Sequence, residues 1–281
     1  MDTLPILRRA WIPGLWLLLW QGAALLVGEE LLLPAPLPVL GRMAALLGEG
    51  RFWLACGHSL GRILLGFLLG VALGCLLAVL SACFPPAGAF LAPAMAAVKA
   101  TPVASFVILA LVWLRGENLS IFISFLMVLP LVWQNTSQGI AGADHQLLEM
   151  ARVYRLSPQA TLRAVYLPAA LPHLLSALRV GLGFAWKAGI AGEVLAIAPS
   201  SIGRQLHDAK TSLEMVDLFA WTGFIILLSV ALERGMVALL ARIFPGKEGS
   251  RRCVPISPSA PPAGCSSGTS PFPCPLERLS Q

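Results

Sequence analysis

Long apolar stretches with almost no charged residues are the feature that most constrains the fold of this chain. The stretch "LGRILLGFLLGVALGCLLAVL" (60–80) contains a single charged side chain. About 20 apolar residues in a helix cross the hydrocarbon layer of a bilayer. Lipid offers no hydrogen bonds to the backbone, so only helices and closed barrels can span it. Because these stretches lack the alternation of barrel strands, they predict an all-α integral membrane protein.

The composition agrees with a chain that is surrounded by lipid. Of its 281 residues, 57% are hydrophobic and only 12% are charged, whereas about a quarter are charged in a typical soluble domain. The net charge of +6 could indicate nucleic-acid binding, but loops on the cytoplasmic side of membrane proteins collect Lys and Arg. We therefore expect no nucleic-acid partner. The six cysteines show no ligand spacing, so neither a metal site nor a disulfide framework is expected.

Six segments are long and apolar enough to be predicted as membrane spans. They are residues 11–28, 60–83, 94–114, 119–141, 174–198 and 217–243. The first span follows Arg8 and Arg9, as a signal peptide would. No small-residue cleavage pattern precedes Glu29, and further spans follow, so we interpret this segment as an uncleaved span.

The second span carries glycines at four-residue spacing. Gly66, Gly70 and Gly74 fall on one face of a helix. Because they have no side chains, another helix can approach that face closely. We interpret the pattern as helix packing.

The distribution of basic residues predicts the orientation. With the N-terminus inside and six alternating spans, 13 of the 20 Lys and Arg residues, Lys99 among them, are assigned to the inner side and six to the outer side, with Lys187 inside the fifth span. Positive charge favours the cytoplasmic side. We therefore expect a multi-pass protein of the bacterial inner membrane with both termini in the cytoplasm.

Composition also divides the chain into three parts. Residues 1–54 hold the N-terminal end, the first span and an external loop, and residues 55–244 form the predicted core. Residues 245–281 are rich in Pro, Ser and Gly without apolar periodicity, which predicts a disordered cytoplasmic tail.

A polar segment, residues 144–172, interrupts the apolar chain between the fourth and fifth spans. Asp144 is predicted to cap a first helix. An apolar stripe follows at helical spacing: Leu147, Leu148, Ala151 and Tyr154. Ser157 followed by Pro158 signals a second helix.

The second helix of this segment is expected to run to about Tyr166. Leu167-Pro168 and Leu171-Pro172 are predicted to close it before the fifth span. A pair of capped helices with one apolar side could rest on lipid. The tight junction between them favours instead a surface on which a soluble partner docks.

This segment resembles the cytoplasmic coupling loop, the EAA motif, of permease subunits of bacterial ABC importers. Glu149-Met150-Ala151 stand where the motif begins, and Val165-Tyr166-Leu167-Pro168 stand at its Ile-x-Leu-Pro end. Arg155 occupies the position of the motif's glycine. Glycine tolerates a positive φ at little cost, whereas arginine is strained there. Either the turn is built differently, or Arg155 contacts the partner.

Other segments of the chain are similar to the nitrate/sulfonate/taurine class of these permeases. They are "HSLGRILLGFLLG" (58–70), "TPVASFVILALVW" (101–113), "LRVGLGFAWKAGIAGEVL" (178–195) and "SIG" (201–203). The resemblance covers about residues 55–243. It implies a type I importer permease (MetI-like) fold with about six transmembrane helices.

The resemblance also implies the partners. Two such permeases, here a homodimer, act with a cytoplasmic ABC ATPase dimer and an extracytoplasmic solute-binding protein. The chain has no GxxxxGK[ST] loop, so ATP would be used by the partner, and no cofactor is expected on this chain. The implied solute is a small anion such as a sulfonate, nitrate or taurine, although a neutral heterocycle stays possible by the same resemblance.

The motif implies a set of residues that contact the ATPase. They are Glu149, Met150, Ala151, Arg152, Arg155, Leu156, Ser157, Pro158, Leu167 and Pro168. No catalytic residue is expected.

Charged and unusual residues within the spans are the candidates for the solute pathway. They are Thr101, Pro102, Trp186, Lys187 and Glu193. An ionisable residue inside a span is a functional candidate. Lys187 could attract an anionic solute, or it could bond another span or reach the interface. Trp186 could equally be a packing residue, and Glu193 matches an acidic position that the family shows.

Two other classes of protein were weighed. A secondary transporter or channel would use Lys187 and Glu193 without an ATPase, but it has no need for a docking loop. A membrane-embedded enzyme is poorly supported, because His58, His145 and His173 are scattered and form no HExxH or triad pattern.

Overall fold

The computed structural model describes residues 4–243, and within this range it is built of helices without strands. The predicted all-α class is therefore confirmed. The predicted tail, residues 245–281, lies outside the described residues. In chain order the α-helices, with a π-helical turn before α9, are α1 (Leu4–Val27), α2 (Pro36–Leu47), α3 (Gly50–Cys83), α4 (Pro85–Ala100), α5 (Val103–Ala110), α6 (Gly116–Ala141), α7 (His145–Val153), α8 (Pro158–Thr161), the π turn (Leu162–Tyr166), α9 (Leu167–Ala196), α10 (Ile202–Thr211) and α11 (Met215–Ile243).

Four described helices are long and apolar enough to cross a membrane: α3, α6, the helix through α8 and α9 (Pro158–Ala196), and α11. The pair α4 and α5 makes a fifth if it counts as one broken span. The apolar part of α1, Gly14–Val27, is shorter. The predicted spans therefore correspond to α1, α3, the pair α4–α5, α6, α9 and α11.

The span predicted over residues 94–114 is broken in the structure and begins earlier, at Pro85. The axes of α4 and α5 differ by 100° across the break at Thr101 and Pro102. Pro102 has no backbone N–H, and its ring drives the preceding residue out of the helical region. Thr101 accordingly has φ −81° and ψ 130°, and its Oγ1 donates to the Ala97 carbonyl at 2.8 Å. The proline thus ends α4 and begins α5 in a new direction.

Helix α6 packs closely against both α3 and α9, and glycines make this possible. A Cβ atom on Gly66 would lie 2.3 Å from the Ile121 carbonyl oxygen of α6, and one on Gly70 would lie 2.9 Å from the Val128 Cβ. On α9, a Cβ atom on Gly189 would lie 2.6 Å from both Ile63 and Ser124. The predicted packing role of the glycine face is confirmed, because only residues without side chains fit these contacts.

The second loop helix does not close at Tyr166, so that prediction is wrong. The helix continues past Pro168 and Pro172 into α9. Residues Pro158–Ala196 form one continuous helix of 39 residues. The reason is the π turn at 162–166, in which the Leu167 N–H bonds to the Leu162 carbonyl. This wider turn precedes Pro168, so the helix passes the proline without ending. At about 1.5 Å per residue the helix is about 58 Å long, well beyond one hydrocarbon layer.

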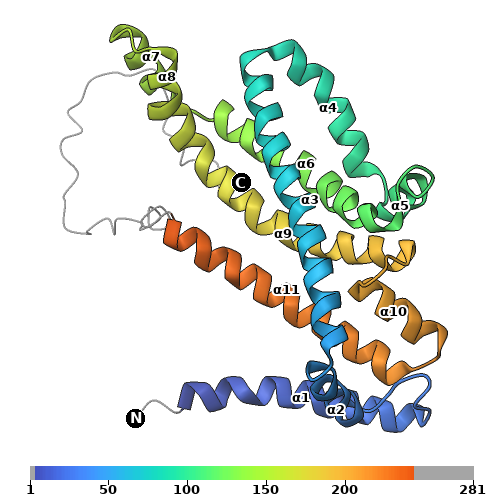
Figure 1. Ribbon diagram of the computed structural model, residues 1–281. Helices are drawn as coiled ribbons and strands as arrows, with labels where there is room; N and C mark the ends of the chain where they lie inside the picture. The colour runs from blue at the N-terminus through green and yellow to red at the C-terminus, as the bar shows by residue number, and fades with distance from the viewer. Residues whose placement is uncertain (1–3, 244–281) are drawn as a thin grey trace, which may run out of the picture. The chain divides into compact units, whose positions relative to one another are not determined.

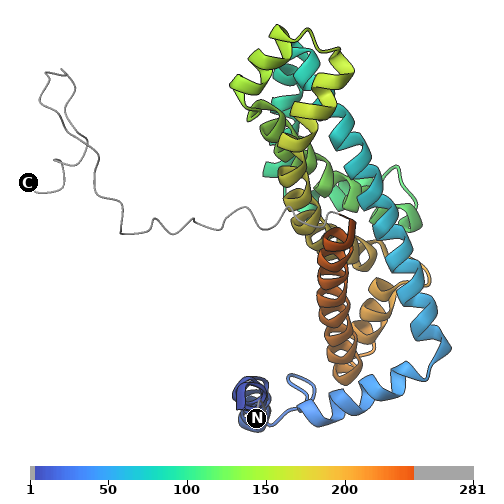
Figure 2. The same ribbon diagram turned by 90° about the vertical axis from the view of Figure 1, so that its left-hand side faces the viewer.

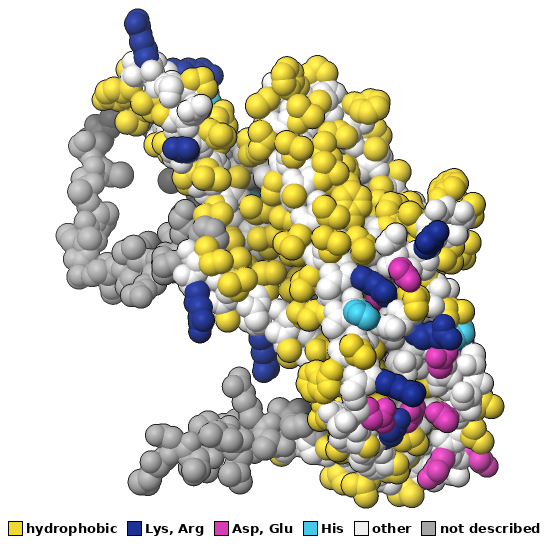
Figure 3. Space-filling view, viewed as in Figure 1, with side chains coloured by type: hydrophobic (Ala, Val, Ile, Leu, Met, Phe, Trp, Pro, Cys, Tyr) yellow, Lys and Arg dark blue, Asp and Glu magenta, His cyan; other side chains and the backbone are white. Residues whose placement is uncertain are grey.

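The surface of the molecule separates apolar from charged regions. Figure 3 shows hydrophobic side chains over the middle of the view, with Lys and Arg at the α7–α8 end and mixed charges around α10. Many large apolar side chains are exposed on the spans, among them Leu65, Leu68 and Leu76 of α3. Lipid or further protein must cover such a surface. Figures 1 and 2 both show the α7–α8 pair and α10 at opposite ends of α9.

Candidate functional site: the α7–α8 loop and the charged residues of the spans

Both predicted helix caps of the polar loop are present. The Asp144 side chain accepts from the Gln146 N–H at 2.9 Å, and the Ser157 hydroxyl accepts from the Ala160 N–H at 3.3 Å, with Pro158 in the first helical position. An N-cap of this kind contributes about 1 kcal/mol. The loop is therefore a defined pair of short helices at one end of the molecule (Figure 1).

Arg155 adopts the left-handed conformation that a glycine would favour, with φ 51°. The Leu156 N–H bonds to the Ala151 carbonyl at 2.9 Å, and the Arg155 N–H bonds to the Arg152 carbonyl at 3.1 Å. These bonds close α7 in the manner of a Schellman motif. Of the two alternatives raised by the sequence, a rebuilt turn is excluded. The left-handed turn is kept, at a cost of about 1–2 kcal/mol for a residue with a Cβ atom.

Arg155→Gly is expected to raise the melting temperature of the purified protein, and Arg155→Val is expected to lower it. Glycine relieves the left-handed strain, whereas a β-branched residue is a genuine outlier at positive φ. The difference between the two variants should be about 1–2 kcal/mol, measured by thermal unfolding in detergent. Equal melting temperatures would show that the turn is not left-handed in solution.

The apolar stripe predicted for α7 is only partly turned inward. Ala151 is buried, whereas Leu147 and Tyr154 are exposed. Met150 and Val153 add to the apolar surface, with 53% and 79% of their area exposed. Exposure of this kind on a short, capped helix requires a covering surface.

The polar side chains of α7 are on the outside as well. His145 Nδ1 and Glu149 Oε1 are 3.2 Å apart, and both side chains are mostly exposed. Arg152, Arg155, Leu156 and Leu167 are also exposed. At the base of the loop, α9 packs against α6 through small residues, because a Cβ atom on Gly139 of α6 would lie 2.7 Å from the Ala170 Cα. The loop thus combines a fixed base with an exposed mixed surface.

The pathway candidates on α9 lie in different surroundings. Trp186 is buried, and its Nε1–H donates to the Ile225 carbonyl of α11 at 3.2 Å. Glu193 is also buried and contacts α3 and α10. Lys187 is exposed, within a stripe of α9 that also exposes Val180 and Phe184. The structure thus places Lys187 on an open face and the other two against neighbouring helices. Their roles in a pathway stay predictions.

A second lysine within the spans, Lys99, was assigned by the sequence to the inner side. It lies in the last turn of α4 and donates to the Gln134 side chain of α6. Because α4 begins at Pro85, Lys99 is about 21 Å along the helix. The break at Thr101 and Pro102 follows directly. Counting helical residues from the "FPP" sequence at 84–86 would have placed this lysine inside the span.

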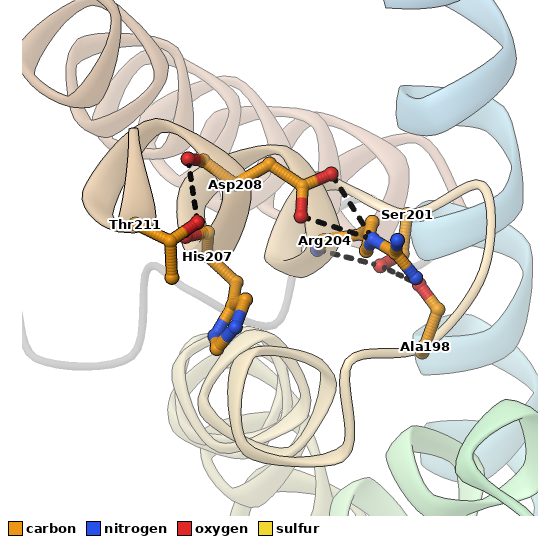
Figure 4. A network of polar contacts seen from close by, with 6 residues as sticks. All are labelled: Ala198, Ser201, Arg204, His207, Asp208 and Thr211. Atoms are coloured by element: carbon orange, nitrogen blue, oxygen red, sulfur yellow. Dashed lines mark hydrogen bonds and ion pairs between the residues drawn. The ribbon is translucent and has the colours of Figure 1, made fainter. Parts of the chain in front are cut away.

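At the opposite end of α9, a polar network shapes the start of α10 (Figure 4). The Ser201 hydroxyl accepts from the Arg204 N–H at 3.0 Å and donates to the Ala198 carbonyl at 2.7 Å. Arg204 Nε bonds to Asp208 at 3.0 Å, one turn further along α10. The cap and the ion pair hold a short amphipathic helix at the end remote from α7.

A bundle of membrane helices with a capped helix pair at one end fits a transport permease, and the family comparison gives the class. The family model described as "binding-protein-dependent transport system inner membrane component" matches residues 44–244. This chain therefore belongs to that family, in its nitrate/sulfonate/taurine class of ABC importer permeases, and is a multi-pass inner-membrane protein.

Curated relatives match over most of the chain. SsuC of Bacillus subtilis, named for aliphatic sulfonates transport, is 30% identical over 84% of this chain and 87% of its own length. The taurine transport permease TauC of Escherichia coli is 27% identical over 87% and 88%. The bicarbonate transport permease CmpB of Synechocystis is 28% identical over 72% of each chain.

Proposed function

We propose that this chain is the membrane-spanning subunit of an ATP-driven importer of a small anion, and that it is coupled to a separate ATPase through residues 144–172. The observation that carries the proposal is the α7–α8 pair. Both helices are capped by side chains, and α7 with its C-cap exposes Met150, Val153 and Tyr154. A carrier that works without a soluble motor needs no such surface.

The orientation and the partners follow from this proposal. The α7–α8 end faces the cytoplasm, in agreement with the basic residues of the loop, and both termini lie on that side. The α10 end faces a solute-binding protein. Two copies of the chain, each with an ATPase subunit, enclose the pathway, with the exposed stripe of α9 toward it. When ATP closes the ATPase dimer, the α7–α8 pairs move as rigid bodies and change the side from which the solute is accessible.

The solute is proposed to be an anion because of the cations in the spans. Lys99 and Lys187 each place an ammonium group at membrane depth, where an unpaired charge costs about 2.5–3.5 kcal/mol. Neither has an ion-pair partner among the residues that the structure describes. An anion in transit would offset that cost. The names of the relatives refer to sulfonates, taurine and bicarbonate. They support a small oxyanion as the solute.

The test is uptake by membrane vesicles that carry the complete transporter. Labelled ethanesulfonate, taurine and bicarbonate are offered with ATP supplied to the cytoplasmic side, and then without ATP under an imposed ion gradient. We expect uptake of at least one of these anions only with ATP and the binding protein. Uptake driven by the ion gradient alone would make the chain a secondary carrier and would refute the proposal.

A further inference from the structure

A buried carboxyl group joins three helices at the end of α9 that is remote from α7. Glu193 has no exposed surface. Its Oε2 accepts from the Ser59 hydroxyl of α3 at 2.6 Å and from the Gly203 N–H of α10 at 3.4 Å. The Ser59 hydroxyl in turn accepts from the Ile202 N–H at 2.9 Å. We name these four residues the Glu193 junction.

The junction leaves no space for adjustment. A Cβ atom on Gly203 would lie 2.4 Å from the Cβ atom of Glu193 and 2.5 Å from the Val194 nitrogen. Real Cβ atoms do not approach backbone so closely, so α10 begins in direct contact with the last turns of α9. The start of α10 cannot shift relative to α9 without breaking the hydrogen bonds of the junction.

Helix α3 also holds the turn between α9 and α10. Arg62 donates to the Pro199 carbonyl at 3.2 Å, and His58 Nδ1 lies 3.3 Å from the Ser200 carbonyl oxygen. Within this turn Ile197 and Ser200 have φ values of 51° and 50°. Such conformations persist only where the surrounding contacts impose them. The junction and these bonds therefore fix a strained turn in one conformation.

The helix that contains α9 begins, at its other end, in the α7–α8 pair. The helix that begins at Pro158, directly after the Ser157 cap, continues without interruption to Ala196. A single helix thus connects the exposed loop at one end with the Glu193 junction at the other, as Figure 1 shows. Because α10 is fixed to this helix, a tilt at one end must displace α10 at the other.

We infer that Glu193 is a positioning residue that makes α10 move together with α9 and α3, and that it thereby transmits between the α7–α8 pair and the α10 face. This inference rests on the proposed function, in which the ATPase binds the first surface and the solute-binding protein binds the second. Glu193 acts through α10 and does not itself contact the solute.

The experiment compares variants that break the junction with variants that keep it. Glu193→Ala removes the bonds to Ser59 and Gly203, and Ser59→Ala removes the bonds to Glu193 and Ile202. Ser59→Ala is the milder change should the first fail to fold. Glu193→Gln retains an accepting oxygen for Ser59 and Gly203. Ser124→Ala is the matched control, because the Ser124 hydroxyl is equally buried and donates to the Ala185 carbonyl of the same helix at 3.1 Å.

Two measurements are made on the full-length protein. In the complete transporter, Glu193→Ala and Ser59→Ala should keep the basal rate of ATP hydrolysis. The factor by which the solute-loaded binding protein stimulates hydrolysis should fall at least about fivefold in these two variants. Glu193→Gln and Ser124→Ala should keep that stimulation. In the purified chain, hydrogen exchange at the Ile202 and Gly203 amides should be at least about tenfold faster in the two junction-breaking variants only.

The outcomes separate this inference from the proposed function. Full stimulation in Glu193→Ala, unchanged amide exchange, or an equal loss of stimulation in Ser124→Ala would overturn the positioning role. Absence of ATP hydrolysis in the wild-type complex would overturn the proposed function instead, and the exchange measurement would still decide whether Glu193 fixes α10.

Discussion

Replacing Met150 and Val153 together by aspartate is expected to abolish transport-coupled ATP hydrolysis while the chain still inserts and folds. Both side chains are more than half exposed, so the folded chain loses little packing. Burial of each against a partner contributes about 1.5–3 kcal/mol, and aspartate would add a desolvation cost. The ATPase should therefore bind at least about 100-fold more weakly, measured by its co-purification and by the solute-stimulated rate of hydrolysis.

A matched control for this variant is available at the other end of the molecule. Leu213 is 60% exposed in the turn between α10 and α11, so Leu213→Asp introduces one aspartate at the end remote from α7 and should leave co-purification of the ATPase unchanged. Glu149→Arg reverses a charge on α7 and is expected to impair coupling in the same direction. Wild-type stimulation in both α7 variants would contradict the assignment of the loop.

Lys187→Met is expected to reduce anion uptake at least about tenfold and to leave the melting temperature unchanged or higher. The ammonium group is exposed on α9, and removal of a charge at membrane depth saves about 2.5–3.5 kcal/mol of insertion free energy. A loss of uptake without a loss of stability would therefore reflect contact with the solute. Uptake is measured with the labelled anion that the wild-type transporter carries.

Two further variants make this result specific. Lys187→Arg keeps the charge and should retain a large part of the uptake. Arg242→Met removes an exposed cation in the last turn of α11 and should retain the wild-type uptake. If Lys187→Met transports as well as the wild type, the lysine has no role in the pathway, and its alternatives are a bond to another span or a position at the interface.

The sequence was sufficient for those features that depend on local chemistry. Four-residue spacing of Gly66, Gly70 and Gly74 predicted a close helix contact, because the missing side chains decide it whatever the partner is. Asp144 and Ser157 predicted helix starts, since each cap bonds within its own turn. The class of the fold followed from the length of the apolar stretches.

Features that depend on contacts between distant residues, or on the course of whole helices, were predicted less well. Pro168 is a strong signal for a helix end, yet a π turn carries the helix past it. The spacing of Leu147, Ala151 and Tyr154 predicts one apolar stripe, but it does not determine that Ala151 is buried while the other two are exposed. Lys99 was assigned to the inner side because the start of α4 at Pro85 was not foreseen.

The glycine contacts of α3 also limit how the molecule can move. A shift of α3 along α6 by one residue would bring Leu65 or Phe67 into the position of Gly66, where even an added Cβ atom would lie 2.3 Å from the Ile121 carbonyl oxygen. Register shifts between these two helices are therefore sterically forbidden. We therefore expect α3, α6 and α9 to move together during a transport cycle.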